Sequence, residues 1–354
     1  MGTAKQLLQF DGRPLLQRVL ENLRGSAVTE IILVLGHAAD AISNEIDLRG
    51  LRVVTNHDYR QGMGTSLRAG LTAVDPHAEA AIIVLADQPF VKPATLNLLI
   101  EEHRRSRAQI VIPTYRGFRG NPVLLDRCVF AEIMCLGGDV GCRAIFGDHV
   151  EGIVKVPVDD AGILLDMDRK SDLEKHHSIR TRLEKENWLL ETAHLSGEQT
   201  SVEDGAHPEL VIVGRDNVAV ALARLAKVLR FTVTVVDPLL AASELPEADQ
   251  VLHVLDFSIL PARSDRHVVV TSRGACDEEA IEQALKVNSA YVALVAKRKR
   301  GEEVLRALRA HGLGEEQLAR VRVPAGLEIG AETAEEIALS ILGEIVSMRK
   351  RPPT

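Results

Sequence analysis

An aspartate that follows an apolar run is the first residue whose type and position suggest chemistry. Asp87 comes two residues after Ala81–Leu85, a continuous apolar run that predicts a strand buried on both faces of a sheet. A carboxylate at the carboxyl end of a parallel strand faces the crevice where α/β sheets bind ligands. Mg²⁺ takes one or two such carboxylates together with substrate phosphates. An aspartate in this place can also cap a helix, so Asp87 alone leaves both interpretations open.

Glycine-broken loops could supply the groups around such a site. The segment Gln61–Arg68 leads into a predicted helix, where backbone N–H groups can meet a phosphate or a nucleobase. Lys5 could neutralise the charge that develops in phosphate transfer. Two further turns of the same kind lie at 119–122 and 138–143. Each is an ordinary turn when taken singly, but five such loops in one domain favour a ligand site.

A second glycine turn follows an apolar run in the C-terminal half. Gly214 keeps the first glycine of the dinucleotide fingerprint G-x-G-x-x-G, and Asp237 is the acidic residue expected about 20 positions further on. Asp216 replaces the middle glycine, and its bulk and charge oppose a pyrophosphate. The pattern predicts a Rossmann scaffold, and we favour another partner or nucleotide over tight NAD binding in the usual pose.

Two further features of this half each have two interpretations. Cys276 precedes an acidic, helix-forming stretch, and a helix N-terminus lowers a thiol pKa and favours a reactive thiolate. The favoured alternative is a buried, inert cysteine. The basic run Lys297–Arg300 could receive an anionic cofactor or be a solvated face. The spacing of the four cysteines fits neither a C-x-x-C metal pair nor a small disulfide framework, which predicts reduced thiols.

The elements that must position these residues alternate between apolar strands and amphipathic helices. In the first half the pattern predicts strands at 31–35, 51–54, 81–85, 110–112 and 162–165, and helices at 15–23, 65–73, 94–104 and 171–190. In the second half it predicts strands at 210–213, 232–237, 251–255, 267–270 and 290–294, and helices at 218–229 and 333–348. Continuous apolar strands indicate parallel sheets covered on both faces, so both halves are predicted to be α/β, the second doubly wound.

Length and composition predict two domains. We place them at 1–190 and 208–350 of the 354 residues, with a linker at 191–207 that is poor in apolar residues. The net charge of −8 and the 3% of aromatic residues argue against a nucleic-acid partner and favour small molecules. Since no signal-peptide core and no apolar run of about 18 residues is present, we expect a cytoplasmic protein without a membrane span.

In their order and spacing the loops of the first 180 or so residues resemble the molybdenum cofactor cytidylyltransferases, a branch of the MobA-like nucleotidyltransferases. The resemblance is carried by Met1-Gly2-x-x-Lys5, Gly12-Arg13-Pro14-Leu15-Leu16, Gly62-Met63-x-x-Ser66-Leu67, Ala86-Asp87-Gln88-Pro89, Gly120-Asn121-Pro122-Val123, Gly138-Asp139-Val140-Gly141-x-Arg143 and Leu165-Asp166-Met167-Asp168. It implies a GT-A-like α/β fold. It also implies transfer of CMP from CTP, with GTP as the other possible substrate, to the terminal phosphate of molybdopterin.

The resemblance also implies roles for individual residues. Asp87 would hold Mg²⁺ with Asp166 or Asp168 as a second ligand, and Lys5 would contact the nucleotide phosphates; Asp87 and Lys5 are the expected catalytic residues. The expected nucleotide- and cofactor-binding residues of this domain are Gly62, Met63, Ser66 and Asn121.

The chain departs from this family at its first residues. The family opens with a buried strand and a glycine-rich phosphate loop, roughly L-A-A-G-x-S-x-R-M-G, and Met1-Gly2 resembles the end of that loop. The domain is therefore expected to lack its first, central strand. We favour a start codon assigned too far downstream; the alternative is lost catalysis and a cofactor-binding chaperone.

Three segments of the C-terminal half resemble the XdhC/CoxI family, accessory proteins that mature xanthine dehydrogenase and carbon monoxide dehydrogenase. They are 270–280, 291–300 and 323–331. This resemblance implies binding of the molybdenum cofactor and its delivery to a molybdenum hydroxylase, with Gly214, Asp237 and Cys276 as expected cofactor-binding residues. It argues against a sugar-nucleotide or other cytidylyltransferase, which the front fold alone would allow.

Overall fold

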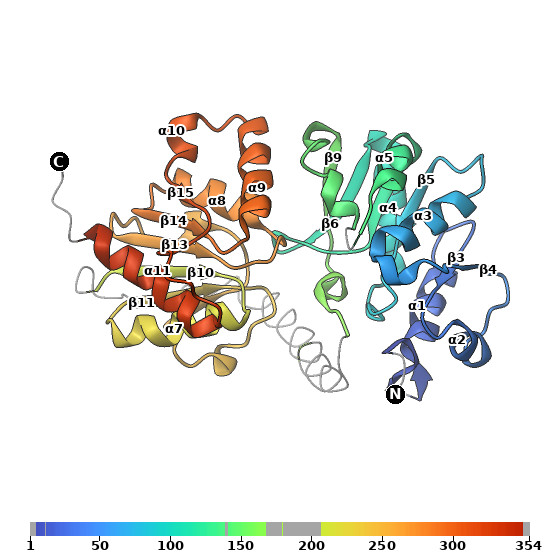
Figure 1. Ribbon diagram of the computed structural model, residues 1–354, viewed down its shortest axis with the longest axis horizontal. Helices are drawn as coiled ribbons and strands as arrows, with labels where there is room; N and C mark the ends of the chain where they lie inside the picture. Colours follow the sequence, from blue (N-terminus) through green and yellow to red (C-terminus); the bar gives the residue numbers. More distant parts are fainter. Residues whose placement is uncertain (1–4, 11, 139–140, 168–178, 180–206, 350–354) are drawn as a thin grey trace, which may run out of the picture. The chain divides into compact units, whose positions relative to one another are not determined.

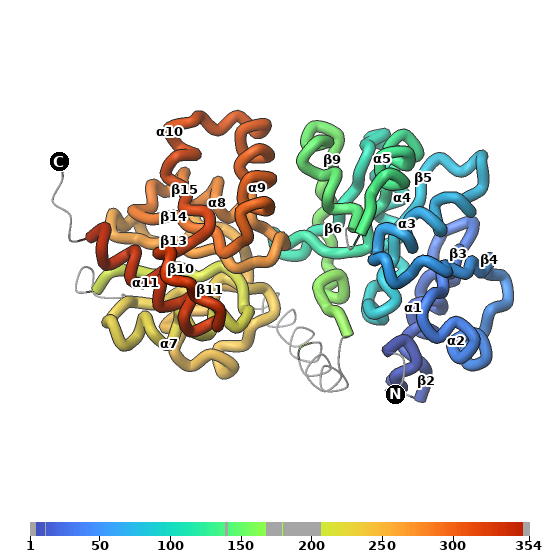
Figure 2. The backbone as a smooth tube through the Cα atoms, in the orientation of Figure 1, coloured from blue at the N-terminus to red at the C-terminus, as the bar shows by residue number. Residues whose placement is uncertain are grey.

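The computed structural model describes residues 5–10, 12–138, 141–167, 179 and 207–349. The chain divides into two compact units near residue 197, and the second unit also takes in Arg116–Phe118. Figures 1 and 2 show the course of the backbone through each unit. The segments predicted as a helix at 171–190 and as a linker at 191–207 lie outside the described residues, except for Ile179 and His207.

The first unit begins with a hairpin and a small parallel sheet. The hairpin strands are β1 (Gln9–Phe10) and β2 (Arg13–Pro14), and α1 (Leu15–Arg24), β3 (Ile32–Leu35), α2 (Ala39–Glu45) and β4 (Arg52–Thr55) follow. Strands β3 and β4 pair in parallel, as predicted. The apolar face of α1 packs with Leu33, Leu35 and Ile42 in one core cluster.

A second sheet carries the rest of this unit. Its elements are α3 (Met63–Ala73), β5 (Ala80–Ile83), α4 (Pro93–Ser106), β6 (Ile110–Tyr115), β7 (Phe118–Arg119), β8 (Val123–Asp126), α5 (Phe130–Cys135) and β9 (Ile153–Pro157). The strand order is β5-β8-β6-β7, with β9 paired to β6. Strand β8 is antiparallel to both β5 and β6, so the expectation of a wholly parallel sheet is wrong. The reason is the short connection from Tyr115 to Val123, because a parallel neighbour needs a crossover of a dozen or more residues.

In the first unit β3 and β5 belong to two different sheets. Within the described residues each of these two strands has one hydrogen-bonded neighbour, β4 and β8 respectively. All four residues of β5 are only half-buried. In contrast, every residue of the central strand of the second unit is buried. The apolar β5 was expected to be covered on both faces, and that prediction is wrong for this strand.

Short 3₁₀ helices fill the connections. They are η1 (Lys5–Leu7), η2 (Tyr59–Gln61), η3 (Arg127–Val129), η4 (Cys142–Ile145), η5 (Val150–Gly152), η6 (Ala161–Leu164), η7 (Ala242–Glu244) and η8 (Phe257–Ile259). The segment 162–165, predicted as a strand, forms most of η6, so that prediction is wrong. The Asp160 carboxylate accepts a hydrogen bond from the Gly162 N–H at 3.0 Å and begins the turn.

The second unit is a single parallel sheet with helices on both faces. Its strands are β10 (Glu209–Val213), β11 (Thr232–Val236), β12 (Gln250–Leu252), β13 (Arg266–Val270), β14 (Tyr291–Leu294) and β15 (Val321–Arg322). Its helices are α7 (Asn217–Val228), α8 (Asp277–Lys286), α9 (Arg298–Ala310), α10 (Glu315–Leu318) and α11 (Ala334–Arg349). The order β12-β11-β10-β13-β14-β15 is that of a Rossmann fold, which confirms the doubly wound prediction.

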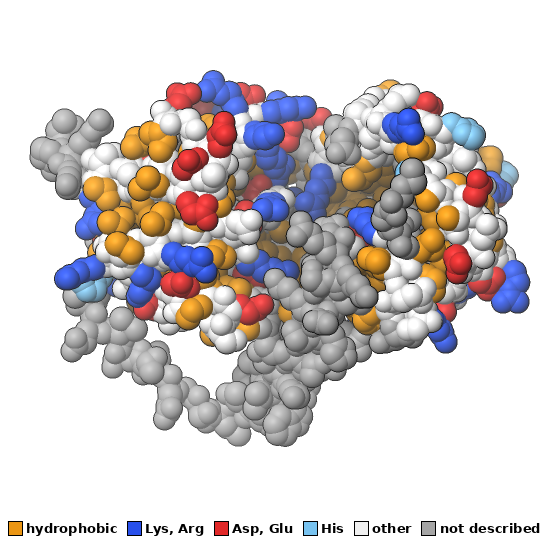
Figure 3. Space-filling model, turned by 60° about the horizontal axis from the view of Figure 1, so that its bottom comes forward, with side chains coloured by type: hydrophobic (Ala, Val, Ile, Leu, Met, Phe, Trp, Pro, Cys, Tyr) orange, Lys and Arg blue, Asp and Glu red, His pale blue; other side chains and the backbone are white. Residues whose placement is uncertain are grey.

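The helices of this unit form two outer layers. Helices α7 and α11 pack together, and their residues share a core cluster with β10, β11 and β14 (Figure 1). Helix α8 packs on β13 and β14 and also contacts α9. Acidic and basic side chains are interspersed over the face of this unit drawn in Figure 3. Among the described residues, no helix combines the length and apolar character needed to cross a membrane.

Candidate active site

An ion pair joins the first turn of the chain to the turn after β5. Lys5 Nζ lies 2.6 Å from Asp87 Oδ2, and the two side chains are 41% and 18% exposed. Asp87 stands in a turn four residues beyond the end of β5, rather than directly at the strand end. The structure thus brings together the two residues that the sequence predicts as catalytic, in a place open to solvent.

Asp166 lies in the segment that passes this turn. The Met167 N–H donates to the Asp87 carbonyl at 2.9 Å, which holds the residue after Asp166 against the backbone of Asp87. Asp166 Oδ1 accepts a hydrogen bond of 2.6 Å from Gln88 Nε2, and Asp166 is exposed. Asp168, the other predicted metal ligand, lies outside the described residues.

The same network reaches the turn that contains Asn121. The Ile163 carbonyl accepts hydrogen bonds from the Asn121 N–H at 3.1 Å and from Gln88 Nε2 at 3.3 Å. Gln88 itself is deeply buried, with a relative exposure of 2%. The turn with Asn121 and the turn with Asp87 and Gln88, which are far apart in the sequence, therefore meet at the Ile163 carbonyl, three residues before Asp166.

This donor set suits a hard divalent cation. Asp87 and Asp166 offer carboxylate oxygens, and Asp87 already faces a positive charge, the Lys5 ammonium. Among the described residues, no group of three or more His, Cys, Asp or Glu side chains could hold a metal. Two carboxylates nevertheless fit Mg²⁺, which usually completes its shell with water and substrate phosphates.

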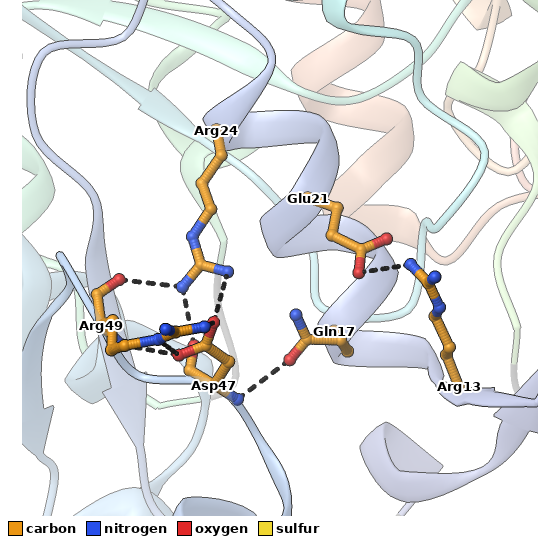
Figure 4. Close-up of polar contacts among 6 residues, drawn as sticks. All are labelled: Arg13, Gln17, Glu21, Arg24, Asp47 and Arg49. Carbon is orange, nitrogen blue, oxygen red and sulfur yellow. Dashed lines mark hydrogen bonds and ion pairs between the residues drawn. The ribbon is translucent and has the colours of Figure 1, made fainter.

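Helix α1 supports the turn that carries Asp87. Asn22 Nδ2 on α1 donates to the Pro89 carbonyl at 3.0 Å, and the Phe10 and Phe90 rings pack edge to face with centroids 5.3 Å apart. The outer side of α1 is held by polar contacts (Figure 4). Arg13 pairs with Glu21, Asp47 N–H donates to Gln17, and Arg24 reaches the carbonyls of Asp47 and Arg49. Hydrogen bonds from Arg49 hold the pKa of Asp47 well below its ordinary value.

The predicted binding residues Gly62, Met63 and Ser66 lie at the N-terminus of α3. Buried Asn56, which directly follows β4, donates from Nδ2 to the Thr65 and Ser66 hydroxyls at 2.9 and 3.0 Å. The Gly64 N–H donates to the Gly138 carbonyl at 3.2 Å, and a Cβ at Gly64 would sit 3.1 Å from the Leu136 carbonyl oxygen. The predicted loops at 61–68 and 138–143 are therefore in contact.

In the second unit the predicted glycine turn sits between the two central strands. The Gly214 φ is +118°, and a Cβ there would lie 2.7 Å from Thr271 Oγ1. Thr271 N–H in turn donates to the Val213 carbonyl at 2.8 Å. Only glycine fits this close approach of β10 to the loop after β13. The switch point of the strand order, where Rossmann folds bind ligands, lies here.

The N-terminus of α7 is already capped by Asp216. Its Oδ1 accepts the Ala219 N–H at 2.9 Å, and its Oδ2 lies 3.1 Å from Arg273 Nε. A carboxylate thus takes the position where a pyrophosphate would accept helix N–H groups. Asp216, which replaces the middle glycine of the fingerprint, therefore opposes pyrophosphate binding at the N-terminus of α7.

Asp237, at the end of β11, is only 6% exposed and is tied to its own loop. Its Oδ1 accepts the Leu239 and Leu240 N–H groups at 2.9 and 3.0 Å, and Arg215 Nε lies 3.7 Å away. Burial raises the pKa of Asp237, and the charge of Arg215 opposes that rise. The carboxylate is positioned at the switch point but is already occupied by two backbone donors.

Cys276 is fully buried, with a relative exposure of 0%, which agrees with the inert interpretation. In the run Lys297–Arg300, the first three residues are exposed. Arg300 instead lies 3.1 Å from both Asp277 Oδ2 and Glu278 Oε1. The possible anion-receiving surface is therefore reduced to the residues at the beginning of α9.

Three residues with contacts at these sites were not predicted as functional from the sequence. Gln88 stands in the motif Ala86-Asp87-Gln88-Pro89, but nothing in its residue type indicates that it reaches Asp166. Asn56 could have been found, since it follows the predicted strand 51–54 at the ligand-binding edge. Arg273 lies in the segment 270–280 that resembles the XdhC/CoxI family, and its pairing with Asp216 depends on the fold.

Comparison with known proteins agrees with this division. Residues 1–153 match the MobA-like NTP transferase domain, and residues 210–345 match the XdhC Rossmann domain. Over 148 residues the chain is 32% identical to nicotine blue oxidoreductase of Paenarthrobacter nicotinovorans, covering 39% of this chain and 71% of that protein. The chain belongs to the MobA-like NTP transferase family. Its second unit is an XdhC Rossmann domain, so the resemblances to the MobA-like and XdhC families and the two predicted fold classes are confirmed.

Other relatives of this MobA-like protein are covered only in part. It is 34% identical to the uncharacterized protein YqeB of Escherichia coli (strain K12), over 42% of this chain and 29% of YqeB. It is 33% identical to one probable xanthine dehydrogenase component of Bacillus subtilis (strain 168), over 41% of this chain and 44% of that protein. A solved structure from Mycobacterium sp. strain JC1, of a homologue of a Mycobacterium tuberculosis protein, is 32% identical, with a TM-score of 0.46. The match covers 52% of this chain and 91% of that one.

Proposed function

We propose that this protein transfers CMP from CTP to the molybdopterin cofactor and delivers the product to a molybdenum hydroxylase such as xanthine or carbon monoxide dehydrogenase. The observation that carries the proposal is the Lys5–Asp87 pair, with Asp166 held beside it by Gln88. The family of the front domain supports a transferase, and the XdhC domain supports a role in maturing the hydroxylase. Such a protein would act in the cytoplasm.

In this reaction a terminal phosphate oxygen of molybdopterin attacks the α-phosphorus of CTP. One P–O bond forms, the bond between the α- and β-phosphates breaks, and pyrophosphate leaves with the electron pair. Asp87, with Asp166 or Asp168, would hold Mg²⁺, which neutralises phosphate charge when bound. Lys5 would contact the phosphates and stabilise the charge of the departing pyrophosphate.

The remaining predicted residues would bind and orient the substrates. Gly62, Met63 and Ser66 offer the N-terminus of α3 to a nucleotide, and Asn56 holds the Ser66 hydroxyl in place. Asn121 is tied to the Ile163 carbonyl near Gln88 and would contact the nucleotide or the pterin. Fixed positions of this kind supply most of the catalysis in phosphoryl transfer.

The XdhC domain would bind the finished cofactor. Gly214 and Asp237 lie at the switch point of its sheet and remain the proposed binding residues. The Cys276 thiol would contribute only if the fold opened, because it is fully buried. Fusion of the two domains keeps the product at a high effective concentration near its carrier.

Release of pyrophosphate tests the proposal. The full chain would be incubated with molybdopterin, Mg²⁺ and either CTP or GTP, and we expect pyrophosphate with CTP in excess of that with GTP. Binding of the cofactor without any pyrophosphate would instead support a non-catalytic chaperone. The observation that favours this second candidate is the divided sheet, in which β3 and β5 each have one neighbour among the described residues.

A further inference from the structure

Gln88 links the Asp87 turn to Asp166 and the Ile163 carbonyl through one buried side chain. Its backbone N–H donates to the Leu85 carbonyl at 3.3 Å, and its side chain is buried with a relative exposure of 2%. The amide nitrogen Nε2 lies 2.6 Å from Asp166 Oδ1 and 3.3 Å from the Ile163 carbonyl oxygen. Both hydrogens of the amide therefore have acceptors.

These two acceptors fix the orientation of the amide. If the group were turned by 180°, Oε1 would face a carboxylate and a carbonyl, with no donor between these acceptors. The nitrogen must face Asp166, so Oε1 points to the other side of the amide. That oxygen is buried and has no hydrogen-bond partner among the residues that the structure describes.

A buried acceptor without a donor is unfavourable, and such atoms mark places where a water, an ion or a ligand group completes the network. Gln88 directly follows Asp87 along the chain, and the same amide group that leaves Oε1 without a donor in the described part of the chain holds the Asp166 carboxylate through Nε2. Mg²⁺ keeps several of its waters when it binds to protein carboxylates, and these waters are strong donors.

We propose that Gln88 is the positioning residue of the cation site. Its Nε2 fixes the Asp166 carboxylate, and its Oε1 accepts a hydrogen bond from a water that arrives with the divalent cation. This inference rests on the proposed function for the presence of a cation at Asp87. It adds that a neutral amide outside the ligand set determines the affinity for that cation, as outer-shell partners do in other metal sites.

The test is Mn²⁺ binding to the full chain without nucleotide, measured by the loss of the free-ion EPR signal. Mn²⁺ takes the same oxygen ligands as Mg²⁺. The site in question is the part of the binding that Asp87→Asn removes. Gln88→Met keeps the side-chain length and removes both hydrogen-bonding atoms. We expect this variant to weaken Mn²⁺ binding at the Asp87-dependent site about tenfold or more. Gln88→Asn should weaken it less, because it keeps the amide, although on a side chain one methylene shorter.

Gln109→Met is the matched control. Gln109 is a half-buried glutamine of the same domain, and its Oε1 is 2.7 Å from His149 Nδ1, away from Asp166. This variant should lose thermal stability while its Mn²⁺ affinity stays unchanged. Gln88→Met should lose Mn²⁺ affinity. Its melting temperature should fall no further than that of Gln109→Met, because the loss of the two hydrogen bonds of Nε2 is offset by removal of a buried acceptor that lacks a donor among the described residues. A purely structural role for Gln88 would lower the melting temperature and leave the affinity alone.

The outcomes distinguish failure of this inference from failure of the proposed reaction. Wild-type Mn²⁺ affinity in folded Gln88→Met and Gln88→Asn would overturn the inference while leaving nucleotide transfer intact. A wild-type chain without any Asp87-dependent Mn²⁺ site would overturn it as well. Mn²⁺ binding that depends on Gln88, in a protein that releases no pyrophosphate, would sustain the inference and refute the proposed reaction.

Discussion

At the scale of single residues, the Lys5–Asp87 pair separates catalysis from stability. Lys5 is 41% exposed, and an ion pair open to solvent contributes about 1 kcal/mol or less to folding. A carboxylate that holds the cation in phosphate transfer contributes far more to the rate. We expect Asp87→Asn to lower pyrophosphate release by about 100-fold or more, with a melting temperature close to that of the wild type.

The control for this substitution is Asp40→Asn, which makes the same chemical change on an exposed residue of α2. Both variants would be compared by pyrophosphate release from CTP and by thermal unfolding. Full Mg²⁺-dependent CTP turnover by Asp87→Asn would refute the assignment of Asp87. Equal loss in both variants would point to a general effect of charge.

Residue types suggested part of this site, and the family resemblance gave these residues their expected roles. Lys5 and Asp87 were noticed because a cation and a carboxylate near a strand end carry their chemistry in the side chain itself; the resemblance made them the expected catalytic pair, and the structure joins them in an ion pair. Gln88 and Asn56 act by holding other groups, and a holding role depends on which loops meet in the fold. Such roles are visible only when hydrogen-bond partners far apart in the sequence are known.

At the scale of elements, the N-terminus of α7 determines what the Rossmann domain can bind. Asp216 caps this helix and places a negative charge where a pyrophosphate would lie. Glycine is a tolerable cap, so Asp216→Gly should lower the free energy of unfolding by only a few tenths of a kcal/mol. We expect it to raise NADH affinity about tenfold or more, because the freed N–H groups and Arg273 can then meet a phosphate.

NADH fluorescence titration would measure this gain, with Asp256→Gly as the control. Asp256 caps the short helix η8 in the same manner, through the Ser258 N–H at 2.9 Å. The control should leave NADH affinity unchanged. If Asp216→Gly bound NADH no better than the wild type, the cap would not be what prevents binding, and the raised pKa and backbone ties of Asp237 would become the explanation.

His267 on β13 is expected to make the stability of the second unit depend on pH in the acid range. Burial lowers the pKa of His267 below its ordinary value of 6.5; the Glu209 carbonyl and Asp265 oppose this effect, and Arg349 adds to it. Its ring also packs against Phe231 and Tyr291. Above about pH 6.5 the imidazole is neutral in both folded and unfolded chains, so its effect on stability is constant. Below that pH the unfolded chain binds the proton first, and stability falls by at most about 1.4 kcal/mol per pH unit.

Urea unfolding between about pH 5 and pH 8 would show this slope. His267→Gln keeps a donor for the Glu209 carbonyl and removes the titrating group, so its stability should depend less on pH in the acid range. His311→Gln, at an exposed position after α9, should keep the wild-type slope. Identical slopes for all three proteins would show that His267 does not titrate differently in the folded state.

The elements themselves were predicted unequally in the two domains. In the Rossmann domain each strand is a short apolar run followed by a helix, and βαβ units leave little freedom in order or direction, so the doubly wound fold followed from pattern. In the first domain β8 follows β6 after a short connection, and periodicity carries no information about strand direction. The segment 162–165 is apolar because it is buried, but Asp160 turns it into η6.

At the scale of the whole molecule, a substitution in one domain should impair the activity of that domain and leave the activity of the other unchanged. The exposed lysines Lys297 and Lys299 lie at the beginning of α9 in the XdhC domain, where an anionic cofactor or an acidic surface of the client would be attracted. The proposed transfer site lies wholly in the other domain. We expect Lys297→Glu with Lys299→Glu to leave pyrophosphate release unchanged and to lower activation of the client hydroxylase, most strongly at low salt.

A matched double reversal, Lys227→Glu with Lys286→Glu, tests whether position matters beyond charge. Both lysines lie in the same domain and are exposed, and they pair with Asp249 and Glu282. This control should activate the hydroxylase as the wild type does. Loss of pyrophosphate release in the Lys297 and Lys299 variant would mean that the two domains share one site. Unchanged activation in that variant would remove α9 from the delivery surface and leave the switch point at Gly214 and Asp237 as the place where the cofactor is held.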